Sequence, residues 1–569
     1  MNKQKLSPFT FFCNRYLAFF LFLLGYSFVL SLWGGLPPLW SSLRLEAPFL
    51  LYSYFLCNYL LKKSRWQPWL AALPIVIAYT IADLYHIAYG RFGRIVEISE
   101  IPELFEVLPF RYIALIGLVG AISFLVLIIS LDWRHWRRSL VASLPVVALI
   151  FVVELAPSTF LTAFQFLGKE VVEWSDALSV ENNGRFTMVA YFEALRKNSI
   201  KKTLAFRQKH EFIDQMAALT QQIKASPKNR NVHLVVLESF LDPKLFSGLK
   251  FSQPPTAPAF SKLIGKTDTY SISPVFGGGT AQAEFEVLCG VPAYRALSGV
   301  EFTMFTGVKT SCLPSVLGDA GYHTMVSNAS RPNFFNAIPA YKGTGFQNIF
   351  FPKENAPDMD TYLSAGDVKK EWYMFDGKLF NQNLAYVGKY LEEHPGQPLF
   401  NYIMSIYGHT PHYMDEAVRP QIIKLLSAQK DEQLEHAVNQ HYYRTEAIAQ
   451  YVQGLLKIDP HSIIILVSDH VPPLSFGPDT YKKFQYMKNI ENSVYYNRIV
   501  IIENGKTMQY DTIHHYEVPK LIANYLTNGA YCRTKQCSFV KKTIADQNPT
   551  QNPTNSQDDY MTIMAHATM

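Results

Sequence analysis

The first 165 residues of this 569-residue chain contain long apolar runs separated by short polar segments. A helix that crosses a bilayer core needs about 20 predominantly apolar residues. Such runs must form helices there, because lipid offers no partner to the polar groups of an irregular backbone. We therefore predict five membrane-spanning helices. They are expected at Tyr16–Trp33, Ala47–Leu61, Trp69–Tyr89, Tyr112–Leu131 and Leu140–Phe160.

Basic residues in the short loops predict the orientation of these helices, since cytoplasmic loops carry an excess of Lys and Arg. One basic cluster precedes the first span, another follows the second and a third follows the fourth. These clusters comprise Lys3, Lys5, Lys62, Lys63, Arg65, Arg134, Arg137 and Arg138. All three fall on one side of the membrane when the N-terminus is cytoplasmic. An odd number of spans then places everything after Phe160 outside the cytoplasm.

Three further segments are expected after residues 1–164. Residues 165–230 mix polar and apolar side chains, which favours a juxtamembrane connector along the headgroups or an amphipathic linker packed on the soluble part. Residues 231–544 alternate short β-branched runs with helical stretches, which is typical of an α/β domain with a largely parallel sheet. Residues 545–569 are rich in Asn, Gln, Thr, Pro and Asp and predict a disordered tail. The predicted strands are Val232–Leu237, Tyr322–Val326, Leu399–Ile406, Ile463–Val467 and Arg498–Ile502.

The charge balance excludes one class of function. The net charge of +6 is modest for the length of the chain. The sequence contains no basic stripe of the kind that follows a phosphate backbone. We therefore expect no nucleic-acid partner.

A glycine-rich stretch carries the first candidate for chemistry. Gly277, Gly278 and Gly279 precede Thr280 within VFGGGTAQAEFEVLCG, and Thr280 is expected in the first turn of a helix. Glycine permits close approach of the backbone to a ligand, and a helix N-terminus attracts anions such as phosphate. A hydroxyl at this position becomes a nucleophile when a metal ion lowers its pKa. A plain glycine-rich turn capped by Thr280 is the alternative.

Several predicted strands end in residues that can bind a metal ion. The first strand ends at Glu238, and the fourth ends at Asp469 and His470. His409 and His412 follow the third strand. Ligands gather beyond the carboxyl ends of strands in such sheets. Two carboxylates, an imidazole and a hydroxyl form a mixed set of oxygen and nitrogen ligands that suits Mn²⁺ or Zn²⁺.

The order of these segments is LES, GGGTAQAEFEVLCG, SCLPSVLGDAGYHT, YGHTPHY and SDH. This order resembles the lipoteichoic acid synthase family of membrane phosphoglycerol transferases, within the alkaline phosphatase/sulfatase superfamily. The architecture is similar too, with five spans, a connector and an external catalytic domain. The resemblance implies a five-helix transmembrane bundle and an extracytoplasmic, sulfatase-like α/β domain. It also implies a multi-pass protein of a bacterial cytoplasmic (inner) membrane.

The resemblance implies a mechanism as well. Thr280 matches the nucleophile of the family, which takes glycerophosphate from phosphatidylglycerol, releases diacylglycerol and passes the group to a glycan or polyglycerophosphate acceptor. His409 matches a substrate-contacting histidine that protonates the leaving group or holds a phosphate oxygen, with a hydrogen-bonded loop residue as the alternative. The expected cofactor is a divalent metal ion, Mn²⁺, with Zn²⁺ or Mg²⁺ as alternatives. Its ligands match Glu238, Thr280, Asp469 and His470.

The sequence departs from the family in SNASRPNFFNAIPAYKGTGF, which resembles the stretch that supplies a Trp and an Arg to the glycerophosphate pocket. Phe335 stands at the Trp position, Ala337 stands at the Arg position, and Arg331 lies upstream as a replacement. We expect Phe335 and Arg331 to bind substrate, with packing and surface roles as the alternative. A phosphoethanolamine transferase of the same superfamily and a catalytically inactive membrane scaffold are the alternative functions.

The remaining cysteine and acidic residues near these motifs are expected to be structural. Cys312 begins CLPSV, but the sulfatase signature that converts a cysteine into a nucleophile needs Arg where Val316 stands. Cys532 with Cys537, and Cys289 with Cys312, can form disulfides outside the cytoplasm, although spacing alone does not decide the pairing. The negative charge of Glu284 is explained by its place near a helix N-terminus.

Overall fold

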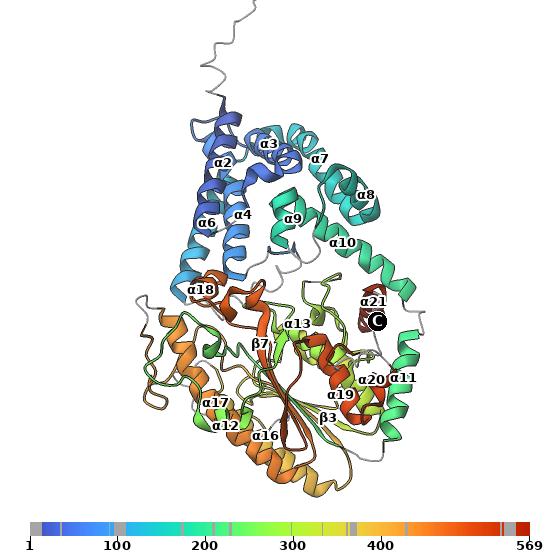
Figure 1. Cartoon of the computed structure of the whole chain (residues 1–569). Helices are drawn as coiled ribbons and strands as arrows, with labels where there is room; N and C mark the ends of the chain where they lie inside the picture. The colour runs from blue at the N-terminus through green and yellow to red at the C-terminus, as the bar shows by residue number, and fades with distance from the viewer. Residues whose placement is uncertain are drawn as a thin grey trace, which may run out of the picture. The chain divides into compact units, whose positions relative to one another are not determined.

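The computed structural model of the chain consists of two units, Met1–Lys201 and Lys202–Met569, which are described separately (Figure 1). The structure describes residues 14–34, 37–89, 92–95, 110–171, 176–206, 211–226, 230–297, 299–332, 334–359, 362–364, 373–426, 431–534, 537–539 and 553–569. The predicted basic residues Lys3 and Lys5 lie outside these ranges.

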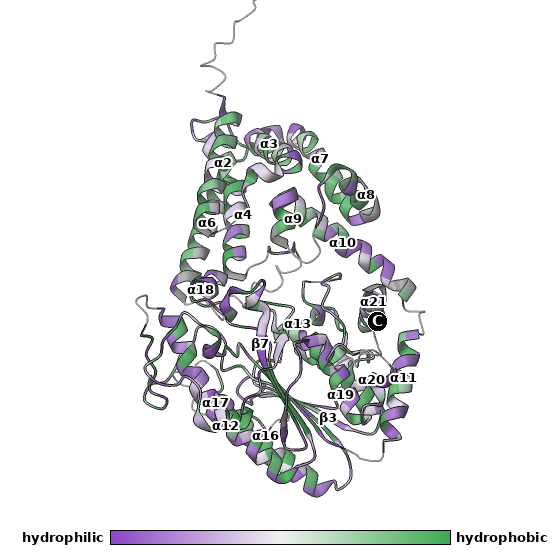
Figure 2. Cartoon of the chain, in the orientation of Figure 1, coloured by the Kyte–Doolittle hydropathy of each residue, from purple (hydrophilic) through white to green (hydrophobic). Residues whose placement is uncertain are grey.

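Unit 1 is helical, and Figure 2 shows apolar residues along most of its helices. Among the described residues, four segments are long and apolar enough to cross a membrane: Arg15–Leu32, Gln67–Ile87, Ile113–Ser130 and Trp133–Leu155. Four of the five predicted spans correspond to these segments. The helices of the unit are α2 (Arg15–Gly34), α3 (Leu43–Leu60), α4 (Gln67–Tyr89), α6 (Phe110–Ser130), α7 (Trp136–Leu155), α8 (Pro157–Leu167), α9 (Asp176–Asn183) and α10 (Arg185–Phe206).

Two predicted spans differ in detail from the structure. The second is α3, an 18-residue helix that carries Arg44 and Glu46 in its first turn and falls outside the four segments. The fifth was predicted as one helix through Phe160, but α7 ends at Leu155 and α8 begins at Pro157. Proline lacks the N–H that would continue a helix and fits the first position of a new one, which explains the break.

The turns after α3 and α6 lie together. Leu61 and Leu131 form an antiparallel bridge, and the Lys62 N–H donates to the Ser130 carbonyl at 2.8 Å. Both turns carry basic residues that were predicted to share one side of the membrane. Their pairing agrees with the predicted order of the spans.

The predicted connector is not one segment but divides between the two units. Glu46 of α3 accepts hydrogen bonds from the N–H groups of Phe186 and Thr187, so it caps the start of α10. Arg185 forms a buried ion pair with Asp83 of α4, with 2.6 Å between Nε and Oδ1. Helix α11 (Glu211–Lys224) belongs instead to unit 2 and packs on its helices. The start of α10 is therefore an integral part of unit 1.

Unit 2 is built on a nine-stranded sheet with the order β4-β3-β5-β1-β6-β7-β2-β9, and β8 pairs with β7. Strands β4, β3, β5, β1 and β6 run parallel, and β7 is antiparallel to β6. This confirms the predicted α/β fold and all five predicted strands. The strands are β1 (Val232–Leu237), β2 (Tyr270–Ile272), β3 (His323–Asn328), β4 (Asn348–Phe350), β5 (Leu399–Met404), β6 (Ile463–Ser468), β7 (Tyr496–Glu503), β8 (Lys506–Met508) and β9 (Ile513–His514).

Helices cover both faces of the sheet (Figure 1). Helices α12, α16 and α17 pack together on one face, and α11, α13, α14 and α19 pack together on the other. Strands β1, β5 and β6 are buried along their whole length because both faces are covered. The helices are α12 (Pro258–Ile264), α13 (Thr280–Cys289), α14 (Leu313–Asp319), α15 (Ala337–Thr344), α16 (Asp376–Glu393), α17 (Glu432–Ile458), α18 (Pro478–Lys483), α19 (Val518–Leu526), α20 (Ala530–Thr534) and α21 (Pro553–Ala567).

The prediction of a disordered C-terminal tail is wrong for residues 553–567, which form α21. This helix buries Tyr560, Ile563 and Met564 in unit 2. The Tyr560 ring contacts the ring of Phe285 on α13, and its hydroxyl donates to the buried Glu301 at 3.2 Å. The segment is polar overall, but the burial of its few apolar side chains keeps it ordered.

Candidate active site

The glycine-rich turn before α13 delivers Thr280 to the first position of the helix. Gly277, Gly278 and Gly279 have φ values of +67°, +156° and +81°, a region that side chains disfavour. A Cβ atom on Gly277 would lie 2.9 Å from Pro473, and one on Gly279 would lie 2.7 Å from a side-chain oxygen of Gln282. The first and third positions therefore require glycine both for backbone conformation and for space.

The parallel sheet brings the predicted metal ligands to Thr280. Glu238 directly follows β1, and Asp469 and His470 follow the neighbouring strand β6. One ligand atom from each of these three residues lies within 4.8 Å of the others. The Thr280 hydroxyl donates to Oε2 of Glu238 at 3.2 Å. The four residues predicted from the sequence thus lie in one cluster, and all are buried.

Hydrogen bonds fix this cluster on one side and leave ligand atoms on the other. The Ser239 N–H donates to Oδ1 of Asp469 at 2.7 Å, and the Ser239 hydroxyl donates to Oε1 of Glu238 at 2.8 Å. Oδ2 of Asp469 and Nε2 of His470 are buried, lie 3.3 Å apart and have no hydrogen-bond partner among the described residues. Burial, with the nearby Asp469 carboxylate, holds the pKa of Glu238 well above its usual range.

A divalent cation fits the chemistry of this cluster. Two carboxylates, one imidazole nitrogen and one hydroxyl are a common ligand set for such ions. A cation would compensate the buried acidic groups, which otherwise raise the free energy of the folded chain. Glu238, Thr280, Asp469 and His470 are therefore the residues that could hold the metal.

His409 lies close to the cluster, whereas His412 does not join it. His409 is partly buried in the loop after β5, and its Nδ1 lies 2.6 Å from the Thr410 carbonyl. Burial lowers the pKa of His409 to about 4, and the charges of His470 and Asp469 act on it in opposite directions. His412 is 1% exposed and pairs with Gln440 of α17 at 3.0 Å.

A small pocket opens beside Thr280. Phe335 contributes to its wall, and so does Ala337, at the position where the resembled family has Arg. Arg331 is exposed and is not among the lining residues. None of the described lining residues is Lys or Arg. The pocket is lined by Glu238, Thr280, Glu284, Phe302, Asn328, Ser330, Phe334, Phe335, Ala337, Met404, Ser405 and Ile406.

An unusual turn positions the aromatic wall of this pocket. Phe335 and Asn336 both have positive φ values, +47° and +59°. The Asn336 side-chain amide donates to the carbonyls of Phe302 and Phe305 at 2.9 and 2.8 Å. Backbone in this region is costly for residues other than glycine and occurs preferentially at functional sites. These hydrogen bonds hold the turn in place.

Glu284 lines the pocket, whereas its sequence position predicted an interaction with the helix N-terminus or a role in orienting the turn of Thr280. Its Oε1 accepts hydrogen bonds from the hydroxyls of Tyr341 at 2.7 Å and Tyr402 at 2.8 Å. Burial raises the pKa of Glu284 to about 7, while the two tyrosine hydroxyls act to lower it. The sequence signal that Glu284 lies near Thr280 is its position four residues later, which places both side chains on one helix face.

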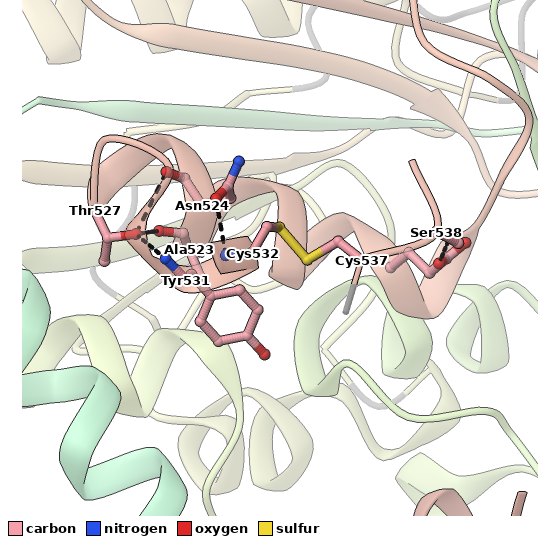
Figure 3. Close-up of a disulfide and its surroundings, with 8 residues drawn as sticks. Ala523, Asn524, Thr527, Tyr531, Cys532, Cys537 and Ser538 are labelled. Atoms are coloured by element: carbon pink, nitrogen blue, oxygen red, sulfur yellow. Dashed lines mark hydrogen bonds between the residues drawn. A yellow bond between two sulfur atoms is a disulfide. The ribbon is translucent and has the colours of Figure 1, made fainter. Parts of the chain in front are cut away.

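Two disulfides brace unit 2. Cys289 at the end of α13 pairs with Cys312, the residue before α14, which agrees with a structural role for Cys312. Figure 3 shows the second bond, between Cys532 and Cys537. Beside it the Cys532 N–H donates to the Asn524 side chain at 3.1 Å, which fastens α20 to α19 (Figure 3). Both pairings that the sequence left open are therefore present.

Comparisons with known proteins identify the family of this chain. The Sulfatase family model matches residues 230–517, about half of the chain. A putative cyclic beta-1,2-glucan modification protein of Rhizobium meliloti (strain 1021) is 25% identical over 275 residues. That match covers 46% of this chain and 38% of the relative, so the chain spans less than half of the relative's length.

Similar solved structures include a synthase and a transferase. The lipoteichoic acid synthase LtaP of Listeria monocytogenes has a TM-score of 0.43 and 19% identity, and the match covers 54% of this chain and 77% of that one. The phosphoglycerol transferase GacH of Streptococcus pyogenes, solved with sn-glycerol-1-phosphate, has a TM-score of 0.45 and 16% identity. That match covers 64% of this chain and 92% of the GacH chain.

Proposed function

Because this chain belongs to the sulfatase family, we propose that it is a membrane-anchored, metal-dependent phosphotransferase with a phospho-threonine intermediate. The proposed donor is phosphatidylglycerol, and the proposed acceptor is a glycan or a polyglycerophosphate chain. The observation that carries the proposal is the convergence of Glu238, Asp469 and His470 on the Thr280 hydroxyl. The same convergence opposes an inactive scaffold, which has no need of a buried acidic cluster.

The first step forms a covalent intermediate on Thr280. Its Oγ1 attacks the donor phosphorus as the bond from phosphorus to the diacylglycerol oxygen breaks. The hydroxyl proton passes to Glu238, to which it already donates, and the departing diacylglycerol oxygen takes a proton from water. A bound divalent ion, proposed as Mn²⁺, would lower the pKa of the hydroxyl and neutralise the phosphoryl oxygens. The N–H groups at the start of α13 add electrostatic stabilisation to the transition state.

The second step releases the phosphoryl group to the acceptor, and His409 is the proposed base. A carbonyl only accepts hydrogen bonds, so Nδ1 of His409 carries the proton that bonds Thr410. A low pKa keeps the ring neutral at pH 7, which leaves a lone pair on Nε2. That nitrogen can take the proton of the acceptor hydroxyl as the hydroxyl oxygen attacks phosphorus. The bond from phosphorus to Thr280 breaks, its Oγ1 takes back the proton from Glu238, and His409 returns its proton to water.

The proposed location is a bacterial cytoplasmic (inner) membrane, with unit 2 on the extracytoplasmic side. The apolar helices of unit 1 support membrane anchoring. The basic loops support a cytoplasmic position for the turns after α3 and α6. The two disulfides support an oxidising compartment for unit 2.

Phosphoethanolamine transfer is the second candidate function, and one observation on the pocket lining favours it. The described lining of the pocket has no basic side chain, three phenylalanines and the acidic Glu284. Aromatic faces and a carboxyl group favour an ammonium ion. The family's Arg position, Ala337, offers no group for a glycerol hydroxyl.

A lipid-turnover assay tests the function. Full-length protein with Mn²⁺ is expected to release diacylglycerol from phosphatidylglycerol, and Thr280→Ala is expected to abolish the release. Mass spectrometry of trapped protein is expected to find glycerophosphate on Thr280. Turnover of phosphatidylethanolamine alone would favour the second candidate, and turnover of neither lipid would overturn both.

A further inference from the structure

Glu284 lines the same pocket as Thr280, the proposed nucleophile. It lies one helical turn after Thr280 on α13, so the two side chains share a helix face. Both residues line the same pocket, and Glu284 is 5% exposed. The pocket therefore extends from Thr280 to Glu284.

Two buried tyrosines hold the Glu284 carboxyl group in one orientation. Tyr341 and Tyr402 are fully buried, and both donate to the same oxygen, Oε1. The Asn328 side chain donates in turn to the Tyr341 hydroxyl at 2.7 Å, which orients that donor. Both described hydrogen bonds to Glu284 thus end on one oxygen, and Oε2 is left for a ligand. A group held this firmly loses little entropy when a ligand binds.

The rest of the pocket is mostly apolar. Phe302, Phe334 and Phe335 supply aromatic surface, and Met404 and Ile406 supply aliphatic surface. A polar headgroup that enters it needs a hydrogen-bond partner, because an unsatisfied buried polar group is costly. Apart from the cluster around Thr280, the described lining offers Glu284, Asn328, Ser330 and Ser405 as polar partners.

From this geometry we propose that Glu284 is a specificity-determining residue that accepts a hydrogen bond from the distal hydroxyl or ammonium group of the donor headgroup. The role rests on the proposed phosphotransferase function. It explains how the pocket recognises a headgroup without the family's Arg. Donors whose headgroup has no distal hydrogen-bond donor are selected against, because Oε2 then stays desolvated without a partner.

Three phospholipid donors test this inference: phosphatidylglycerol, phosphatidylethanolamine and phosphatidylmethanol, whose headgroup has no hydrogen-bond donor. Wild-type protein is expected to prefer one of the first two over phosphatidylmethanol by at least about tenfold in kcat/KM. Glu284→Gln keeps an oxygen for the two tyrosines but turns an amide N–H₂ toward the headgroup. This variant is expected to lose about 10- to 100-fold in kcat/KM on the preferred donor, and less than about twofold on phosphatidylmethanol.

Glu286→Gln is the matched control. Glu286 is on the same helix and equally buried, but it does not line the pocket. This variant is expected to keep wild-type kcat/KM on all three donors. An equal loss on all three donors in Glu284→Gln would overturn the inference, because a structural defect acts on every donor. If that variant does not fold, wild-type turnover of phosphatidylmethanol at the rate of the other lipids would overturn it by itself. Failure of wild-type protein on all three lipids would instead overturn the proposed function.

Discussion

The Thr280 hydroxyl lies 3.2 Å from Oε2 of Glu238, although the two residues are 42 positions apart in the chain. A glycine turn places the first residue at the start of α13, and the end of β1 places the second. Asp469 and His470 reach the same point from the end of β6, the strand beside β1. The cluster is therefore a product of strand order rather than of local sequence.

Removal of a ligand from this cluster is expected to weaken metal binding and activity together. Asp469→Asn removes one anionic ligand, so the affinity of the protein for Mn²⁺ should fall at least about tenfold. Elemental analysis of the full-length protein should then find less bound Mn²⁺. Thr280→Ala should lower lipid turnover by more than about 1,000-fold, because the nucleophile is lost. Thr267→Ala is the control, since its hydroxyl bonds only the Ile264 carbonyl at the end of α12. Normal metal content in Asp469→Asn would contradict the assigned site.

Glu286 is expected to make stability depend on pH. Burial raises the pKa of Glu286 to about 8 from an ordinary value of 4.5, and the neighbouring Glu301 acts in the same direction. The folded chain therefore keeps a proton that the unfolded chain loses above pH 4.5, so its stability falls as pH rises from about 4.5 to about 8. Above pH 8 this contribution becomes constant.

Glu286→Gln should remove that pH dependence. The amide cannot ionise, and its oxygen can still accept the 2.9 Å hydrogen bond from the Ala293 N–H. Thermal unfolding of variant and wild type should coincide near pH 5, and the variant should be more stable at pH 8 by on the order of 3 kcal/mol. An equal difference at both pH values would show that burial does not shift this carboxyl group.

The packing of α21 predicts a clear difference between two substitutions of Tyr560. Tyr560→Ala removes a fully buried ring in contact with Phe285 and Tyr294 and should cost about 3–5 kcal/mol of unfolding free energy. Tyr560→Phe removes only the hydroxyl, which donates to Glu301 and accepts from the Ala296 N–H, and should cost about 1–3 kcal/mol. Thermal unfolding of the full chain gives both values. Equal stability of the two variants would mean that the ring is not packed.

The ion pair between Arg185 and Asp83 predicts strong coupling within unit 1. Both side chains are 2% exposed, so Arg185→Met leaves a buried carboxylate without its partner. We expect this change to cost about 3–5 kcal/mol. The double variant Asp83→Leu, Arg185→Met should recover most of the loss, because it leaves no uncompensated charge. Unfolding of the detergent-solubilised protein measures both, and additive effects would exclude the pairing.

Much of unit 2 could be predicted from the sequence, because short β-branched runs identify parallel strands and strand ends converge. Glu238, Asp469 and His470 were predicted on that basis, and the structure brings them together. Glu284 was missed because its partners Tyr341 and Tyr402 are 57 and 118 residues away. Such a contact depends on tertiary packing and leaves no local pattern.

The errors in the sequence analysis arose where composition hid a smaller pattern. The polar composition of the last residues concealed the buried stripe of Tyr560, Ile563 and Met564 on α21. The fifth span was predicted as one helix from its apolar character, although Pro157 within it signals the helix boundary that the structure has there. The single connector was predicted from its mixed polarity, which carries no signal that Glu46 would cap α10.

The disulfide between Cys289 and Cys312 makes one part of the candidate site depend on its compartment. It fastens the far end of the helix whose first residue is Thr280. That disulfide forms only where thiols are oxidised, so in a reducing compartment the C-terminal end of α13 would lack this covalent link. The cysteine pair thus makes the support of the helix that carries Thr280 depend on the redox state of its compartment.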